Sequence, residues 1–185
     1  MRLSSPRVPP LADHQLSADA AEQLQPMRRG ERVFNIFRTL AHYPALMKRW
    51  LVFANHVLYK STLSPRDREL AILRIGFLCR SGYEFNQHVV IGKQAGITDA
   101  EIERLKIGPA AEGWSDAERA LLTATDELRR DAFVTDATWT ELNKHYDTQA
   151  LMDLVFAVGQ YNLVSMALNS LGVQPEPGLP AFPSR

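Results

Sequence analysis

Residues 63–96 read LSPRDRELAILRIGFLCRSGYEFNQHVVIGKQAG, and this stretch decides how the rest of the chain is interpreted. It places Glu69, Glu84 and His88 among residues whose pattern is otherwise typical of buried helices. An ionised glutamate is rarely fully buried unless it is paired. Burial raises carboxylate pKa values and lowers histidine pKa values, which suits proton transfer near neutral pH. The stretch therefore predicts a buried acid–base site.

The start of this stretch carries a clear helix signal. Ser64 can cap a helix whose first residue is Pro65, where the missing N–H of proline costs nothing. The predicted helix 65–80 is apolar on most sides, which indicates a central helix. On the following predicted helix, 83–95, Glu84 and His88 share the inward face one turn apart, where their side chains can form a hydrogen bond.

Helical periodicity dominates the whole chain, and no segment alternates apolar and polar residues long enough to predict a strand. We therefore expect an all-α protein with a single helical domain over residues 17–173. Prolines at both ends predict an extended N-terminal arm, 1–16, and a Pro-rich C-terminal arm, 174–185. The remaining predicted helices are 18–25, 31–42, 44–59, 99–105, 116–130, 137–145 and 148–171.

Composition excludes several classes of protein. The 185 residues carry 21 basic and 21 acidic side chains, so a nucleic-acid partner is not expected. No apolar run approaches the roughly 20 residues that span a bilayer, and the first residues lack a secretory apolar region, so we expect no membrane partner and a cytoplasmic location. The single cysteine, Cys79, cannot form an intrachain disulfide and is expected to be a small buried hydrophobe.

Four further residues are candidates for binding a substrate: Tyr83, Tyr161, His56 and Trp50. For each of them, packing in the core or at an interface is the more common role. The same holds for an isolated histidine on an apolar face, which is more often part of a satisfied buried pair.

Glu69 also has a structural alternative, as a first-turn carboxylate favoured by the helix dipole or paired with Arg66 or Arg68. Glu69, Glu84 and His88 could in principle ligate zinc or iron. Helical di-metal motifs use a second histidine, which is missing here, so no metal is expected.

The spacing resembles a known motif. Ser81, Glu84 and His88 follow Glu69 by twelve, fifteen and nineteen residues, which is similar to the Glu, Cys, Cys, His motif of alkyl hydroperoxidase D, a member of the carboxymuconolactone decarboxylase superfamily. Here serine and glutamate stand at the two cysteine positions. The resemblance extends to YEFNQHVVIGKQAGI at 83–97, RTLAHYPALMKRWLVFANHVLY at 38–59 and LMDLVFAVGQYNLVSMALNSLG at 151–172.

This resemblance implies an alkyl hydroperoxidase D-like helical bundle that assembles as a homo-oligomer, a trimer or hexamer. It also implies a cofactor-free lyase or proton-transfer enzyme that acts on a small lactone or carbonyl acid. In that role His88 would reprotonate the carbanion left by loss of CO₂, Glu84 would orient His88, and Glu69 would act as relay or second acid.

Two alternatives stay open at this point. The first is a thiol-dependent hydroperoxidase, which lacks its cysteine pair here. The second is a non-catalytic oligomer that binds a small ligand.

Overall fold

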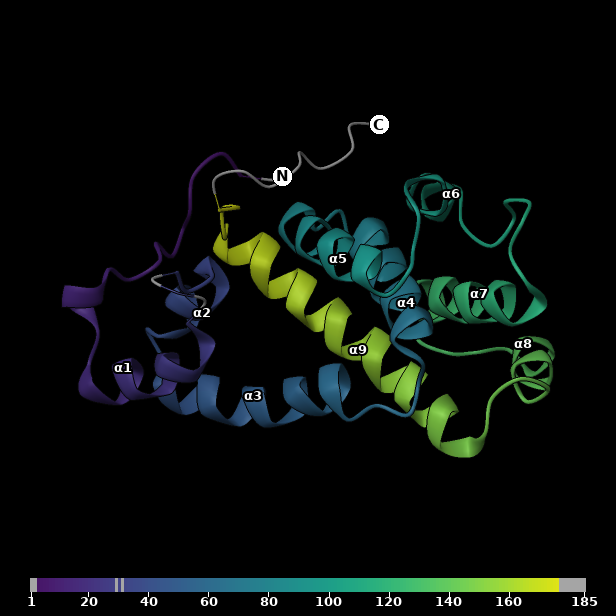
Figure 1. Ribbon diagram of the computed structural model, residues 1–185, viewed down its shortest axis with the longest axis horizontal. Coiled ribbons are helices and arrows are strands. Elements are labelled where there is room, and N and C mark those ends of the chain that lie inside the picture. Colours follow the sequence, from purple (N-terminus) through teal and green to yellow (C-terminus); the bar gives the residue numbers. More distant parts are fainter. Residues whose placement is uncertain (1–2, 29, 31, 177–185) are drawn as a thin grey trace.

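The computed structural model describes residues 3–28, 30 and 32–176, and over these residues the protein is all-helical with no β-strand (Figure 1). The α-helices are α1 (Ala18–Leu24), α2 (Asn35–Leu40), α3 (Pro44–Tyr59), α4 (Pro65–Leu78), α5 (Gly82–Gln94), α6 (Asp99–Ile107), α7 (Asp116–Asp131), α8 (Asp136–Leu142) and α9 (Thr148–Leu171). Short 3₁₀ turns lie at Asp13–Gln15 and Gln25–Met27. The predicted all-α class is confirmed.

Local capping explains where several helices begin. Ser64 Oγ accepts a hydrogen bond of 3.0 Å from Asp67 N at the start of α4. Reciprocal capping boxes open α6, between Thr98 and Glu101, and α7, between Ser115 and Glu118. These three helix starts follow from local sequence alone.

The predicted helix 31–42 is longer than the helix that forms. Residue 31 lies outside the described residues, and α2 begins only at Asn35, after an extended Phe34 that offers no capping side chain. The first N–H of α2 instead donates to the carboxylate of Glu176, with an Asn35 N to Glu176 Oε1 distance of 2.6 Å. A tertiary contact, rather than a local cap, therefore sets this boundary.

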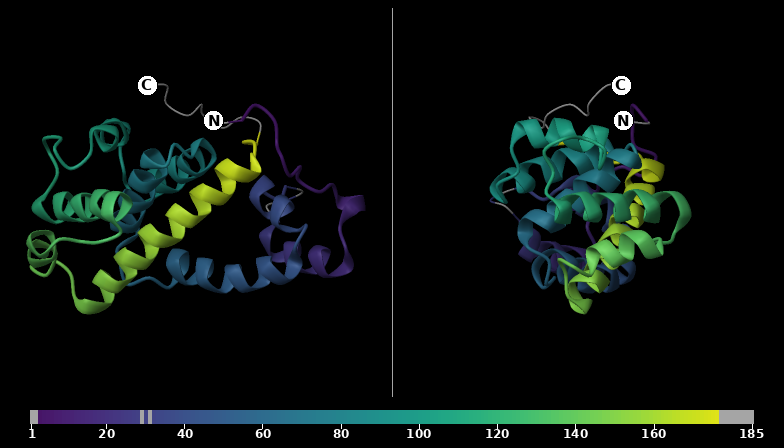
Figure 2. Two further views of the ribbon diagram at one scale, coloured as in Figure 1. Left: turned by 180° about the vertical axis from the view of Figure 1, so that it is seen from behind. Right: turned by 90° about the vertical axis from the view of Figure 1, so that its right-hand side faces the viewer.

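The core is built around α4, which packs against α5, α7 and α9. Every residue of α4 from Glu69 to Gly76 is buried. In Figure 1, α9 runs diagonally across the molecule, with α1–α3 on one side and α6–α8 at the opposite end. The left view of Figure 2, from behind, shows the same separation, with α3 standing apart from the α4–α5 pair. The site described below lies at the α4–α5 pair.

The described part of the N-terminal arm packs against its own chain. Backbone N–H groups of Arg7 and Val8 donate to Leu171 O at 2.9 and 3.1 Å. Of the predicted C-terminal arm, residues 174–176 are described, and the rest lies outside the described residues.

Helix α9 is long and apolar. By length and composition alone it could cross a membrane, with a mean hydropathy of 1.4. Half of its most apolar window is buried inside the molecule, where α9 packs against α4 and α7. This packing is that of a core helix.

Candidate active site

The structure brings Glu69, Glu84 and His88 together in the interior. Glu69 comes from the first turns of α4, whereas Glu84 and His88 lie one turn apart on α5. His88 Nδ1 lies 2.6 Å from Glu69 Oε2, and His88 Nε2 lies 2.9 Å from Glu84 Oε1. All three residues are at most 5% exposed. A histidine is thus held between two buried carboxylates.

A close approach of α4 and α5 makes this arrangement possible. Gly92 lies one turn beyond His88, and a Cβ atom added there would lie 3.1 Å from Leu73 Cδ1 and 3.3 Å from Ile97 Cδ1. The same added atom would contact Glu69 Cβ at 3.9 Å. The missing side chain at Gly92 therefore lets the two helices approach closely enough for Glu69 to reach the imidazole.

Opposing effects act on the protonation of His88. Burial by itself lowers the pKa of the imidazole, but the negative charges and hydrogen bonds of Glu69 and Glu84 outweigh it and raise the pKa to about 10. His88 is therefore an imidazolium near neutral pH, and each of its ring N–H groups donates to one carboxylate.

Tyr161 is the predicted substrate-binding residue that the structure places at this site. Its ring meets the His88 ring edge to face, with centroids 4.8 Å apart. Burial, followed by the charges of Glu84 and Glu69, raises the pKa of the Tyr161 phenol well above its usual value. The phenol is therefore a neutral hydrogen-bond donor at physiological pH.

Arg68 is a site neighbour that the sequence suggested only as a structural partner of Glu69. Its Nε donates to Glu69 Oε1 at 3.2 Å, so both oxygens of Glu69 are engaged, one by Arg68 and one by His88. The Arg68 side chain is 12% exposed. The one signal in the sequence for this contact was that Arg68 directly precedes Glu69.

The other three predicted substrate-binding residues lie elsewhere. Tyr83 and Trp50 belong to a separate apolar cluster with the end of α9. The Tyr83 hydroxyl donates to Glu176 Oε1 at 2.8 Å, and burial is the main cause that raises its pKa. His56 pairs with Asp153 at 3.1 Å, and its side chain is 49% exposed. The structure does not bring these three to the imidazole of His88.

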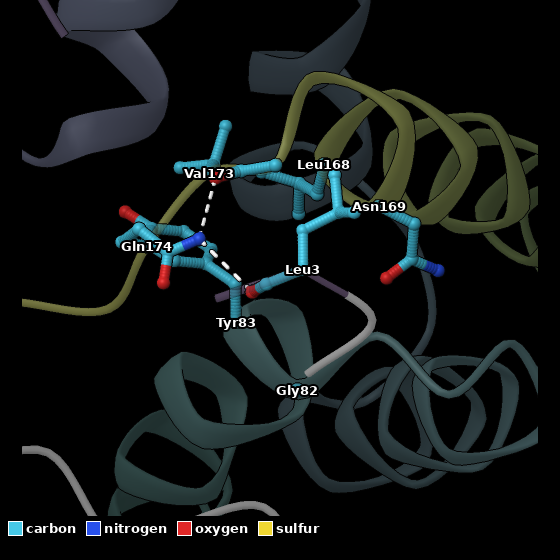
Figure 3. Close-up of a pocket in the computed structure, with 8 residues that line it drawn as sticks. Leu3, Gly82, Tyr83, Leu168, Asn169, Val173 and Gln174 are labelled. Carbon is cyan, nitrogen blue, oxygen red and sulfur yellow. Dashed lines mark hydrogen bonds between the residues drawn. The ribbon is translucent and has the colours of Figure 1, made fainter. Parts of the chain in front are cut away.

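A pocket lies near the N-terminal end of α5, beside the cluster of Tyr83 (Figure 3). Leu3 from the N-terminal arm and Gln174 from the C-terminal segment meet there, and Gln174 Nε2 donates to the Leu3 carbonyl at 3.3 Å. Its lining residues are Leu3, Gly82, Tyr83, Leu168, Asn169, Gly172, Val173 and Gln174. Glu69, Glu84 and His88 do not line this pocket.

Ser81 and Glu84 stand at the two positions where the hydroperoxidase motif has cysteines. Ser81 is fully buried and its Oγ has no hydrogen-bond partner among the described residues. Glu84 belongs to the carboxylate–imidazole cluster described above. Cys79 is 4% exposed, and its Sγ donates to Asn162 Oδ1 at 3.1 Å. Over the residues that the structure describes, no group of three or more His, Cys, Asp and Glu side chains is arranged to hold a metal ion.

Comparison with known proteins relates part of the chain to a protein family and the fold to solved structures. Residues 44–127 match the model of the Carboxymuconolactone decarboxylase family. The matched stretch contains Glu69, Glu84 and His88, and the chain has the fold of alkylhydroperoxidase D-like proteins of known structure. No curated protein matches the chain.

Three solved structures illustrate the shared fold. A peroxidase-related protein with an AhpD core from Ralstonia eutropha JMP134 has a TM-score of 0.81 at 18% identity, covering 93% of each chain. A peroxidase-related protein from Silicibacter sp. TM1040 has a TM-score of 0.80 at 15% identity, covering 95% of this chain and 96% of that one. The debrominase Bmp8, as a cysteine-to-alanine variant in complex with 2,3,4-tribromopyrrole, has a TM-score of 0.73 at 17% identity, covering 94% of each chain. At these identities the similarity establishes the fold.

Proposed function

We propose that this protein is a proton-transfer enzyme of the lyase type that acts on a small lactone or carbonyl acid. The observation that carries the proposal is the buried chain Glu69–His88–Glu84, in which both ring nitrogens of one imidazole lie within 3 Å of a carboxylate. Hydrogen-bonded groups of this kind, shielded from water, are suited to general acid–base catalysis.

The contacts within this chain favour Glu84 as the group that faces the substrate. Both oxygens of Glu69 and both ring nitrogens of His88 are engaged. Glu84 Oε1 binds His88, whereas its second oxygen makes no hydrogen bond with a residue that the structure describes. This division of roles differs from the expectation that His88 itself protonates the substrate.

The proposed reaction is loss of CO₂ followed by protonation of carbon. When the carbon–carbon bond breaks, its electron pair stays on the substrate carbon and is delocalised into the conjugated carbonyl group. The imidazolium of His88 then passes a proton to the carboxylate of Glu84, which delivers a proton to that carbon, and the neutral imidazole regains its proton from solvent. Glu69 holds the imidazole in place and balances its charge. No oxidant or reductant is consumed.

The test is an assay of CO₂ release and of deuterium incorporation at carbon in D₂O, with a panel of small β-oxo acids and lactone acids. Glu84→Gln and His88→Gln should each lower the rate by about 10²–10⁴-fold, the usual contribution of a general acid or base. Glu103→Gln removes an exposed carboxylate on α6 and should leave the rate unchanged. Turnover that persists in both site variants would refute the proposal.

Hydroperoxide reduction is the alternative that the same preparation can test. Formation of a disulfide after attack on peroxide needs an attacking and a resolving thiol, and the chain holds one cysteine. Peroxide turnover that depends on Cys79 would favour this alternative. Binding of panel members without any turnover would favour a ligand-binding protein.

A further inference from the structure

Arg68 stands out among the arginines of α4 because the structure leaves most of its hydrogen-bonding capacity unused. Arg66 makes five hydrogen bonds with described residues, and Arg74 makes four. Arg68 makes one, from Nε to Glu69. The first two arginines join α4 to neighbouring helices, so their guanidinium groups are occupied by structural contacts. The two terminal nitrogens of Arg68 have no hydrogen bond or ion pair with a described residue.

The position of this unused group is informative. The Arg68 side chain is 12% exposed, so its stem is packed and little of it reaches water. It is joined to His88 through a single carboxylate, that of Glu69. Its charge also acts on the phenol of Tyr161, whose ring covers the edge of the imidazole. The terminal nitrogens of Arg68 are not among the buried side-chain atoms without a partner, so an anionic group can reach them from solvent and form charge-assisted hydrogen bonds.

The net charge of the cluster does not repel an anion. Glu69 and Glu84 contribute two negative charges, and the imidazolium of His88 contributes one positive charge. Arg68 therefore brings the cluster to neutrality. Its free N–H groups form a planar fork that matches the two oxygens of a carboxylate.

We propose that Arg68 binds a carboxylate group of the substrate and thereby selects acidic substrates over their neutral counterparts. This inference rests on the proposed function, because the carboxylate that Arg68 binds is taken to belong to the substrate that Glu84 protonates. Pairing with Arg68 stabilises a carboxylate in the ground state, so it would raise the barrier to decarboxylation of that same carboxylate. The carboxylate that Arg68 holds is thus one that the reaction leaves in place.

Binding of an unreactive acid and its ester provides the test. The probes are 4-oxopentanoate and methyl 4-oxopentanoate, titrated into the full-length protein and followed by ligand-observed NMR. Unaltered protein should bind the acid at least about ten times more tightly than the ester, since hydrogen bonds to charged groups contribute on this scale. Arg68→Gln should weaken binding of the acid by roughly 10- to 100-fold and leave binding of the ester unchanged. Arg68→Lys keeps the charge but loses the forked pair of donors, so its affinity for the acid should lie between those of unaltered protein and Arg68→Gln.

Control measurements separate this role from a structural one. Arg49→Gln removes a positive charge from exposed α3, where Arg49 donates only to the Ala45 carbonyl, and should not alter either affinity. If Arg68 only supported Glu69, Arg68→Gln would weaken binding of the acid and binding of the ester alike. This result would overturn the inference. Equal affinity of unaltered protein for acid and ester, or no binding of the acid, would overturn it too.

The outcome is also distinguishable from failure of the proposed function. Binding of these probes requires no turnover, so loss of discrimination in Arg68→Gln is measured independently of any reaction. Discrimination that depends on Arg68, together with turnover unaffected by Glu84→Gln and His88→Gln, would retain the anion site and reject the proton relay.

Discussion

The imidazole of His88 and the carboxylate of Glu69 lie nineteen residues apart in the chain, yet their Nδ1 and Oε2 atoms are 2.6 Å apart in the interior. This contact joins α4 to α5 through a charged pair that water does not reach. With Glu84 on the other ring nitrogen, it defines both the chemistry and the pH behaviour of the site.

The stability of the protein should fall as the pH rises above neutrality. Folding raises the pKa of His88 from about 6.5 to about 10, so the stabilisation is complete below pH 6.5 and is lost as the pH rises through 10. Between pH 7 and about 9.5 we expect the free energy of unfolding to drop by about 2 to 3 kcal/mol. Urea unfolding at several pH values measures this drop. The same series on His88→Gln should show little of it, and an equal drop in that variant would assign the effect to other groups.

The two glutamates should differ in their effect on catalysis. Glu84→Gln removes the acid that is proposed to face the substrate, so we expect a loss of about 10²–10⁴-fold in kcat. Glu69→Gln keeps a hydrogen-bond acceptor for the imidazole but removes a charge, so its loss in kcat should be smaller and its pH profile should shift. Steady-state kinetics over a pH range measures both. A larger loss for Glu69→Gln would reverse the assigned roles.

Cys79 should be dispensable for activity. Its thiol is buried and donates to Asn162, which makes it a packing residue in this structure. Cys79→Ala should leave kcat within about twofold and lower the free energy of unfolding by about 1 kcal/mol through the small cavity it creates. The measurement pairs kinetics with denaturant unfolding. Loss of activity without loss of stability would contradict this reading.

Gly108 should tolerate substitution poorly because Arg74 fills the space beside it. A Cβ atom at Gly108 would clash with the Arg74 guanidinium, which binds both oxygens of Asp126 at 2.7 Å. We expect Gly108→Ala to cost about 2 to 4 kcal/mol, because it displaces a guanidinium whose partner Asp126 is partly exposed and strains a backbone conformation that only glycine adopts readily. Gly96→Ala is the matched control, since Gly96 also has positive φ but no atom within 4 Å of the added Cβ. It should cost only about 1 kcal/mol.

We propose that the protein assembles as a symmetric homo-oligomer through α9 and α3. Large apolar side chains stay exposed on both helices: Phe53, Tyr59, Met152, Phe156, Leu163 and Met166. A helix that is apolar on all sides is normally buried, which a second copy of the chain would achieve here. Light scattering at micromolar concentration should give a mass that is a multiple of 20.8 kDa.

A charged substitution on this face should dissociate the assembly. Phe156→Glu, on the exposed side of α9, is expected to give a folded monomer, whereas Glu103→Gln on α6 should leave the mass unchanged. A monomeric mass for the unaltered protein would contradict the proposal.

Sequence patterns by themselves determined the helices and the presence of buried ionisable groups. The Ser64–Pro65 start and the capping boxes at Thr98 and Ser115 are local signals, because each side chain bonds a backbone group within three residues. The pairing of Glu84 with His88 is likewise local, since residues four apart lie one above the other on a helix.

Tertiary structure alone decided which residues gather around the imidazole. Glu69 and Tyr161 reach His88 from other helices, whereas Tyr83 and His56 pair with Glu176 and Asp153 instead. Those contacts depend on how each helix is rotated and how closely it approaches its neighbour, and helical periodicity carries no information about either. The physical reason is that one helix face can pack against several partners, and only the complete packing of the core selects among them.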